Sequence, residues 1–154
     1  MSSTGVGGKA ISISSCESKY YFYDSGQVTA DDGIKLENIV ACALQKELHL
    51  LEDTMGRRAS LHYLRDKEGR EIDFLVLIDD RPIVMVEVKW ADSTLSRHFT
   101  GFAKCLPGTP GIQVVGRLER EKSFESGFSI VNAAPWLAGL RLENRGSGGT
   151  AATQ

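Results

Sequence analysis

Three charged residues, Asp73, Glu87 and Lys89, interrupt apolar segments of the sequence where buried strands are expected. Glu87 and Lys89 follow the apolar run Ile83–Val86. Because residues two apart in a strand project from the same face, the side chains of Glu87 and Lys89 should lie side by side. A carboxylate next to an ammonium group could hold a cation and stabilise a developing negative charge.

The residues Asp79–Pro82 form a turn signal between the runs that carry Asp73 and Glu87. If this turn closes an antiparallel hairpin, Asp73 lies opposite about Val88 and within reach of Glu87. Two carboxylates that converge away from water repel each other unless a cation joins them. Oxygen ligands of this kind suit Mg²⁺, which usually takes one or two carboxylates together with waters and phosphate oxygens.

A structural interpretation of the same residues stays open. Glu87 and Lys89 could form an ion pair at the exposed end of a strand, with Asp73 capping a turn, because ion-pair networks also place charges in strands. Spacing alone favours neither interpretation. His98, a lone histidine on an amphipathic segment, is interpreted as a surface or packing residue.

The elements around these residues predict an α/β fold. Apolar residues recur at helical spacing from Leu36 to Leu51, and Glu37, in the first turn of this predicted helix, borders the buried stripe. The remaining segments predict, in order, three strands in a meander, a helix, and two strands: Leu61–Arg65, Ile72–Ile78, Ile83–Trp90, Leu95–Leu106, Ile112–Val115 and Phe128–Val131. We therefore expect a mixed sheet sandwiched by helices, with the second helix crossing over to a parallel strand.

The two ends of the chain differ in composition from its middle. Residues 1–18 are predicted to be a flexible leader, residues 19–144 the folded domain, and residues 145–154 a flexible tail. The aromatic run Tyr20–Tyr23 predicts a short strand or buried extended segment followed by a turn.

Composition narrows the classes of function. The 154-residue chain carries a net charge of -2, which argues against a dedicated high-affinity nucleic-acid binder but not against an enzyme that acts on nucleic acid. No apolar run is long enough to span a membrane, and three unpaired cysteines with no signal-like segment predict a cytoplasmic protein. Five basic residues could face a phosphate backbone or simply form a solvated surface: Arg57, Arg58, Arg65, Lys67 and Arg70.

The spacing of the charged residues resembles a known superfamily. An aspartate, about a dozen residues, and then E-x-K at the end of an apolar strand is the pattern of the PD-(D/E)XK phosphodiesterases, matched here by Asp73 and Glu87-Val88-Lys89. Ile72 stands where the nominal proline would be. Many members carry a further acidic residue on a preceding helix, the place that Glu37 occupies.

A closer resemblance covers most of the predicted domain. The segments KYYFYDSG, LENIVACALQKEL, GREIDFLV, IVMVEVKW and APWL, in this order and spacing, are similar to the C-terminal domain, called domain of unknown function 4143, of bacterial and archaeal AAA-type ATPases.

These resemblances imply a restriction-endonuclease-like fold with an αβββαβ core and a Mg²⁺- or Mn²⁺-dependent site that acts on nucleic acid, as in an endodeoxyribonuclease acting on DNA. The implied catalytic residues are Asp73, Glu87, Lys89 and Glu37, and the implied metal ligands are Asp73, Glu87 and Glu37. The alternative is a catalytically silent module that binds nucleic acid or docks on an AAA-type ATPase, because a fold alone does not fix function. The sequence leaves open whether the chain also self-associates.

Overall fold

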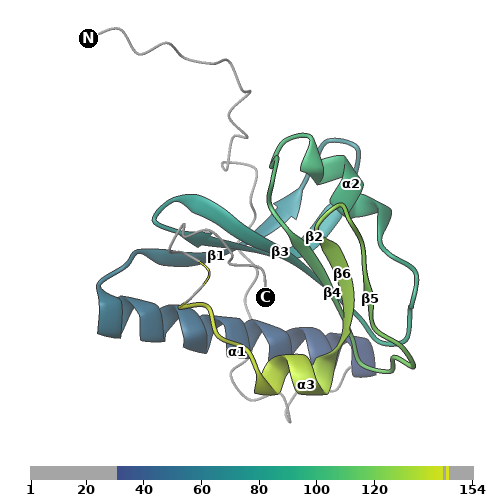
Figure 1. Ribbon diagram of the computed structural model, residues 1–154, viewed down its shortest axis with the longest axis horizontal. Helices are drawn as coiled ribbons and strands as arrows, with labels where there is room; N and C mark the ends of the chain where they lie inside the picture. Colours follow the sequence, from purple (N-terminus) through teal and green to yellow (C-terminus); the bar gives the residue numbers. More distant parts are fainter. Residues whose placement is uncertain (1–30, 144, 146–154) are drawn as a thin grey trace, which may run out of the picture.

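The computed structural model of the protein describes residues 31–143 and residue 145. The predicted leader, the predicted strand at Tyr20–Tyr23 and the predicted tail beyond residue 145 lie outside the described residues. Nine helices and strands follow one another in the described part (Figure 1). They are α1 (Asp32–Met55), β1 (Ala59–Arg65), β2 (Glu71–Ile78), β3 (Arg81–Lys89), α2 (Arg97–Ala103), β4 (Gly111–Val115), β5 (Lys122–Ser123), β6 (Phe128–Asn132) and α3 (Ala133–Ala138).

The six strands form one mixed sheet in the order β1-β2-β3-β4-β6-β5. The first three strands pair antiparallel as a meander, β3, β4 and β6 run parallel to one another, and β5 pairs antiparallel with β6. Helix α2 connects β3 to the parallel strand β4. The predicted α/β class and mixed sheet are confirmed, whereas β5 and α3 were not predicted.

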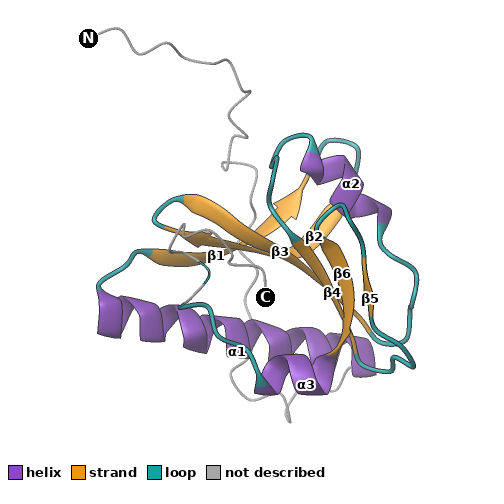
Figure 2. Ribbon diagram, in the orientation of Figure 1, coloured by secondary structure: helices purple, strands orange, loops and turns teal. Residues whose placement is uncertain are grey.

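Helix α1 covers one face of the sheet, as Figure 2 shows. The Asp31 side chain caps its first turn by accepting the amide of Ile34 at 2.9 Å, and Gly56 ends it in the left-handed conformation at φ 62°. Its apolar stripe packs against alternate residues of β3, together with residues of β2 and β4. The β3 residues in this contact are Val84, Val86 and Val88.

Helix α2 covers the other face of the sheet. Its buried residues Phe99 and Phe102 pack in a second apolar cluster that contains Met85 of β3. Phe99 stacks on Phe128 of β6, with ring centroids 5.4 Å apart. The valines of β3 therefore face α1, and the alternate residues that begin with Met85 face α2.

The β2–β3 hairpin closes through a two-residue turn. Asp79 and Asp80 both have positive φ, 51° and 63°, as a type I′ turn requires. Arg57 and Arg58, which precede β1, form ion pairs with Asp79 and Asp80 respectively. The hydrogen bond from Arg57 and the neighbouring positive charges lower the pKa of Asp79.

Candidate active site

The C-terminal end of β3 carries a buried acid next to a lysine. Alternation along the strand places Glu87 and Lys89 on the face that Met85 shares with α2. The Glu87 side chain is 3% exposed, and the Lys89 side chain is 39% exposed. Lys89 Nζ donates to Glu87 Oε1 at 2.8 Å. The strand therefore brings this acid and base together as the sequence analysis expects.

Lys89 stays charged in spite of its partial burial. Burial opposes the charge of its ammonium group, but the hydrogen bond to Glu87 and the charges of Glu87, Asp73 and Asp92 outweigh this effect. The pKa of Lys89 is consequently raised. A permanent positive charge thus lies beside the carboxylates at this end of the sheet.

The second oxygen of Glu87 is the unusual atom of the site. Glu87 Oε2 is buried and has no hydrogen-bond partner among the described residues. A buried carboxylate oxygen without a partner loses its hydration with no direct compensation. A cation or a donor group at this position would satisfy it.

Asp73 reaches the same segment of β3 from a β-bulge in β2. His62 pairs with Leu75 and Leu64 pairs with Ile72, so two residues of β2, one of them Asp73, oppose a single residue of β1. Bulges of this kind turn a side chain away from the regular ladder and are common beside active sites.

The carboxylate of Asp73 has a structural contact of its own. The backbone pairing of β2 with β3 extends to Phe74 and Val86. Beyond this pair, the backbone amide of Val88 donates to Asp73 Oδ2 at 2.8 Å. Asp73 therefore lies against the Glu87-Val88-Lys89 segment and contacts Val88, the residue that the predicted hairpin places about opposite it.

Tyr63 is the single residue of β1 that opposes this bulge. Burial raises the pKa of its hydroxyl, and a hydrogen bond with Glu71 and the charges of Glu71 and Asp73 raise it further. The hydroxyl of Tyr63 thus remains protonated at neutral pH. It adds a neutral polar group to the surroundings of Asp73.

His98 of α2 also lies beside Glu87, although the sequence analysis treats it as a surface or packing residue. Its Nδ1 is 2.6 Å from the carbonyl oxygen of Glu71 and 3.8 Å from Glu87 Oε1. Since a carbonyl oxygen only accepts, Nδ1 carries a hydrogen. The N-cap Ser96, whose Oγ accepts the amide of His98 at 3.3 Å, fixes the backbone at this turn. No signal in a single sequence links this histidine to Glu87.

Gln113 is a second neighbour that sequence reasoning missed. It pairs with Glu87 in the β3–β4 register and its side chain is fully buried. Its amide nitrogen donates to the carbonyl oxygens of Asp92 and Thr94, and its amide oxygen accepts the amide of Ser96. Gln113 therefore fixes the loop that joins Lys89 to α2. In the sequence it is one polar residue in an apolar run, and nothing there marks its role.

Glu37 lies on α1, the helix that covers the opposite face of the sheet from Glu87 and Lys89. In the described part of the chain, no three His, Cys, Asp or Glu residues lie close enough together to form a metal-binding group. A three-carboxylate site of Asp73, Glu87 and Glu37 is therefore not preformed. The role of Glu37 stays a prediction.

Four of the five basic residues that could face a phosphate backbone are instead in local ion pairs. Arg57 and Arg58 pair with the hairpin turn, Arg65 pairs with Glu71, and Arg70 pairs with Asp66 and Glu68. Their charges are largely neutralised where they stand. This cluster fits the alternative of a solvated surface.

The part of the chain that forms this architecture matches a known family. Residues 32–136, which run from the start of α1 into α3, match the family described as domain of unknown function DUF4143. The chain belongs to the DUF4143 family. No curated protein and no solved structure matches it.

The DUF4143 match covers every residue that the candidate site contains, from Glu37 on α1 to Gln113 on β4. It also lies within the predicted domain boundaries of 19–144. Among the described residues of this DUF4143 chain, no helix combines the length and apolar character needed to cross a membrane.

Proposed function

We propose that this chain is a Mg²⁺- or Mn²⁺-dependent phosphodiester hydrolase of the PD-(D/E)XK type, acting on nucleic acid and specifically on DNA. The order of a helix, an antiparallel three-strand meander, a helix and a parallel strand supports a restriction-endonuclease-like fold. The acidic residue on the second strand and the E-x-K segment on the third support the same assignment.

The observation that carries the proposal is the environment of Glu87. A buried carboxylate has one oxygen paired with Lys89 and the other without a partner in the described part of the chain. Such an arrangement costs stability, and a catalytic role or a bound ion is one of the reasons for which it is kept. Asp73, which contacts the same segment of β3, supplies the second carboxylate.

These residues suit a magnesium site of modest ligand number. Mg²⁺ usually retains several waters and takes only one or two carboxylates, so Asp73 and Glu87 suffice without a third acid. When bound, the ion would supply Lewis acidity toward the phosphate and lower the pKa of a bound water. Glu37 would take part only if the start of α1 moves closer to the C-terminal end of β3 when the metal binds.

The protein's own groups would supply the rest of the chemistry. Lys89, held charged beside Glu87, would stabilise negative charge on the phosphate or orient the attacking water. Glu87 would in turn orient Lys89 through their hydrogen bond. The burial of Glu87 keeps bulk water from weakening this electrostatic interaction.

One set of contacts favours the alternative, a silent module that binds nucleic acid or docks on an AAA-type ATPase. The Asp73 carboxylate accepts the backbone amide of Val88 and so links β2 to β3, and Glu87 already has Lys89 as a counter-ion. Both contacts would be retained in a domain that has no catalytic role. The two functions therefore differ in whether the site binds metal and cleaves.

A cleavage assay tests the proposed reaction. The full chain is incubated with single-stranded, duplex and branched DNA in Mg²⁺ or Mn²⁺, beside a Lys89→Ala variant and a Lys104→Ala control at the exposed end of α2. We expect metal-dependent cleavage that Lys89→Ala lowers by roughly 100-fold or more, as for the loss of one charge-stabilising group. Cleavage that Lys89→Ala and Lys104→Ala affect equally would point to a contaminant and contradict the proposal.

Metal binding is tested separately by melting curves with and without Mn²⁺. An ion that binds only the native state stabilises it by RT ln(1 + [L]/Kd), where [L] is the free ion concentration. The wild-type melting temperature should therefore rise with Mn²⁺. Glu87→Gln should melt at or above the wild-type temperature without metal, because the neutral amide removes a buried charge, and it should lose the Mn²⁺ response. A lower melting temperature for Glu87→Gln, with no metal response in either protein, would favour the structural ion pair.

A further inference from the structure

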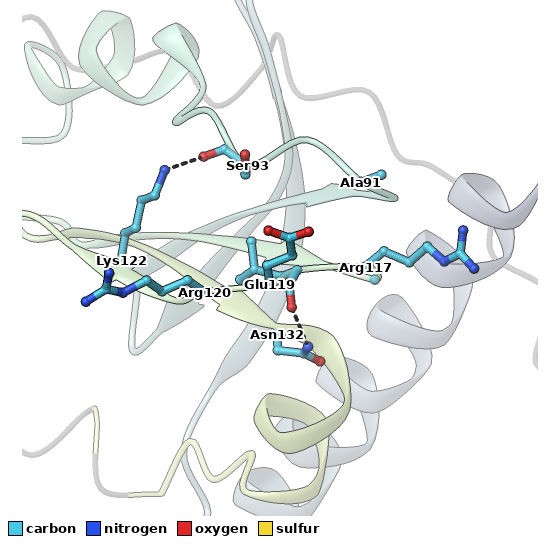
Figure 3. Close-up of a pocket in the computed structure, with 9 residues that line it drawn as sticks. Ala91, Ser93, Arg117, Glu119, Arg120, Lys122 and Asn132 are labelled. Atoms are coloured by element: carbon cyan, nitrogen blue, oxygen red, sulfur yellow. Dashed lines mark hydrogen bonds between the residues drawn. The ribbon is translucent and has the colours of Figure 1, made fainter.

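A cavity of about 720 Å³ opens where the parallel strands end, beyond the candidate active site (Figure 3). Its walls include Ala91 and Ser93 after β3, Gly116 after β4, and Asn132 at the end of β6. The carboxyl ends of parallel strands are a common place for ligands in α/β folds. The volume lies within the roughly 300–1,000 Å³ of typical small-ligand sites.

The loop between β4 and β5 gives this cavity its charge. Arg117 and Arg120 of this loop and Lys122, the first residue of β5, line the cavity together with one carboxylate, Glu119. Figure 3 shows Arg120 and Lys122 extending to the same side of the cavity, while Arg117 points the opposite way, toward α1. The amine of Lys122 donates to the carbonyl oxygen of Ser93 at 3.2 Å, which fixes its position over the loop that follows β3.

Arg120 and Lys122 differ from the arginines near the meander because their charges are not neutralised. Among the residues that the structure describes, neither forms an ion pair with a carboxylate. With Arg117, these two residues outnumber the one carboxylate that lines the cavity, Glu119, and give it a local positive potential even on a chain of net charge -2. This potential favours an anionic ligand.

The lining also indicates which part of such a ligand would be bound. Among the described residues that line the cavity none is aromatic, so they offer no stacking platform for a base. Free cations and small polar residues instead suit phosphate oxygens, which accept from lysine and arginine.

The cavity is joined directly to the strand end that carries the candidate catalytic residues. The amide of Gly116 donates to the carbonyl oxygen of Lys89 at 3.0 Å, and the amide of Arg117 donates to that of Trp90 at 2.7 Å. Lys122 and Lys89 thus border the same short loop, residues 90–96. A chain of phosphates that passes Lys89 would next meet this cavity.

We infer that Arg120 and Lys122 bind the sugar–phosphate backbone of a nucleic acid beside the Glu87 and Lys89 site. The inference rests on the proposed function, because the same strand would present its scissile phosphate to Lys89. The contacts are with phosphates rather than bases, so the binding is independent of sequence.

Fluorescence anisotropy in EDTA tests this binding without cleavage. Labelled oligothymidylate of about 20 nucleotides, longer than typical single-strand sites, and a duplex of the same length are titrated with the full chain. The test variant is Arg120→Gln/Lys122→Gln. The matched control, Lys46→Gln/Arg81→Gln, removes one lysine and one arginine charge from exposed residues of α1 and β3 that do not line the cavity.

The expected result is a selective loss in the test variant. Its Kd for DNA should rise on the order of 10-fold at about 0.1 M salt, and the slope of log Kd against log salt should fall by about 0.7 for each lost single-strand phosphate contact. Arg120→Lys/Lys122→Arg, which keeps both charges, should bind as the wild type does. Melting curves check that all variants are folded.

Three outcomes would overturn the inference: equal losses in the test variant and the matched control, no binding of either DNA by the wild type, or stabilisation by inorganic phosphate without DNA binding. The last would identify a small-anion site. DNA binding that depends on Arg120 and Lys122, in a protein that cleaves none of the substrates with metal, would retain this inference and overturn the proposed hydrolase.

Discussion

The ion pair of Glu87 and Lys89 combines a deeply buried acid with a lysine that still contacts solvent. Removing Lys89 therefore affects stability differently from removing the charge of Glu87. Loss of Lys89 leaves a buried carboxylate without compensation, whereas loss of the Glu87 charge leaves an ammonium group that water can still reach. Glu87 is thus the residue whose partners determine the energetics of the site.

The pKa of Lys89 provides a direct measure of this coupling. Because Glu87 raises it, Glu87→Gln should lower the pKa of Lys89, by an amount that NMR titration of the lysine side chain can measure. A raised pKa contributes stability that is fully present below the unfolded value of about 10.4 and is lost as the pH rises through the folded value. This contribution to stability should therefore be constant at neutral pH and disappear only under alkaline conditions. An unchanged pKa in Glu87→Gln would contradict the contact between the two side chains.

At the scale of elements, the β2–β3 hairpin sets the register that brings Asp73 to β3. Asp80, at φ 63°, adopts a conformation that β-branched residues strongly disfavour. Asp80→Val should therefore lower the free energy of unfolding by about 1–2 kcal/mol, as measured by urea denaturation. Asp80→Gly, which accepts this φ freely, serves as the control because it removes the same ion pair with Arg58. Equal losses in the two variants would assign the effect to the ion pair.

The sequence predicted the longer elements because each carries a periodic signal. The helix that contains Leu36 and Leu51, the three meander strands and the strand at Phe128–Val131 all have clear patterns. It did not predict β5, with two residues, or α3, with six, since six residues make less than two turns of a helix and two residues make only one period of strand alternation. Propensity alone cannot identify elements that tertiary contacts stabilise.

The candidate site shows the same division between local and tertiary information. Alternation along one strand predicted the contact of Glu87 with Lys89, and the turn predicted the approach of Asp73 to Val88. The contacts of His98 and Gln113 could not be predicted, because they depend on where α2 and β4 pack after the crossover. The bulge at Asp73 also arises from pairing with β1, which the spacing of the hairpin does not encode.

At the scale of the whole molecule, Gly116 lies where the sheet, helix α1 and the cavity meet. A Cβ at this position would lie 2.6 Å from Trp90 Cζ3 and 3.1 Å from Leu36 Cδ2. Gly116→Ala should therefore force Trp90 or α1 to shift and lower the free energy of unfolding by about 1–3 kcal/mol, as followed by tryptophan fluorescence in urea.

Gly101→Ala is the matched control for this substitution. The three heavy atoms nearest to its Cβ would all belong to the Arg70 side chain, with Nη1 at 2.7 Å, and a long, partly exposed side chain can move aside. Alanine is also favoured over glycine within a helix such as α2 by up to about 1 kcal/mol. Gly101→Ala should consequently leave the stability unchanged or raise it. A comparable loss in both variants would argue against close packing specific to Gly116.

The β5 side of the sheet has a consequence for how the protein behaves at high concentration. Strand β6 pairs with only two residues of β5, which would leave the rest of its edge as a template for strands of other molecules. The carboxylate of Glu121 accepts the amide of Asn132 at 2.9 Å and so occupies a donor at this edge. The charged Lys122 within β5 adds a residue that intermolecular sheets disfavour. Resistance to aggregation along this edge thus depends on two consecutive side chains, Glu121 at the end of the loop that borders the cavity and Lys122 at the start of β5.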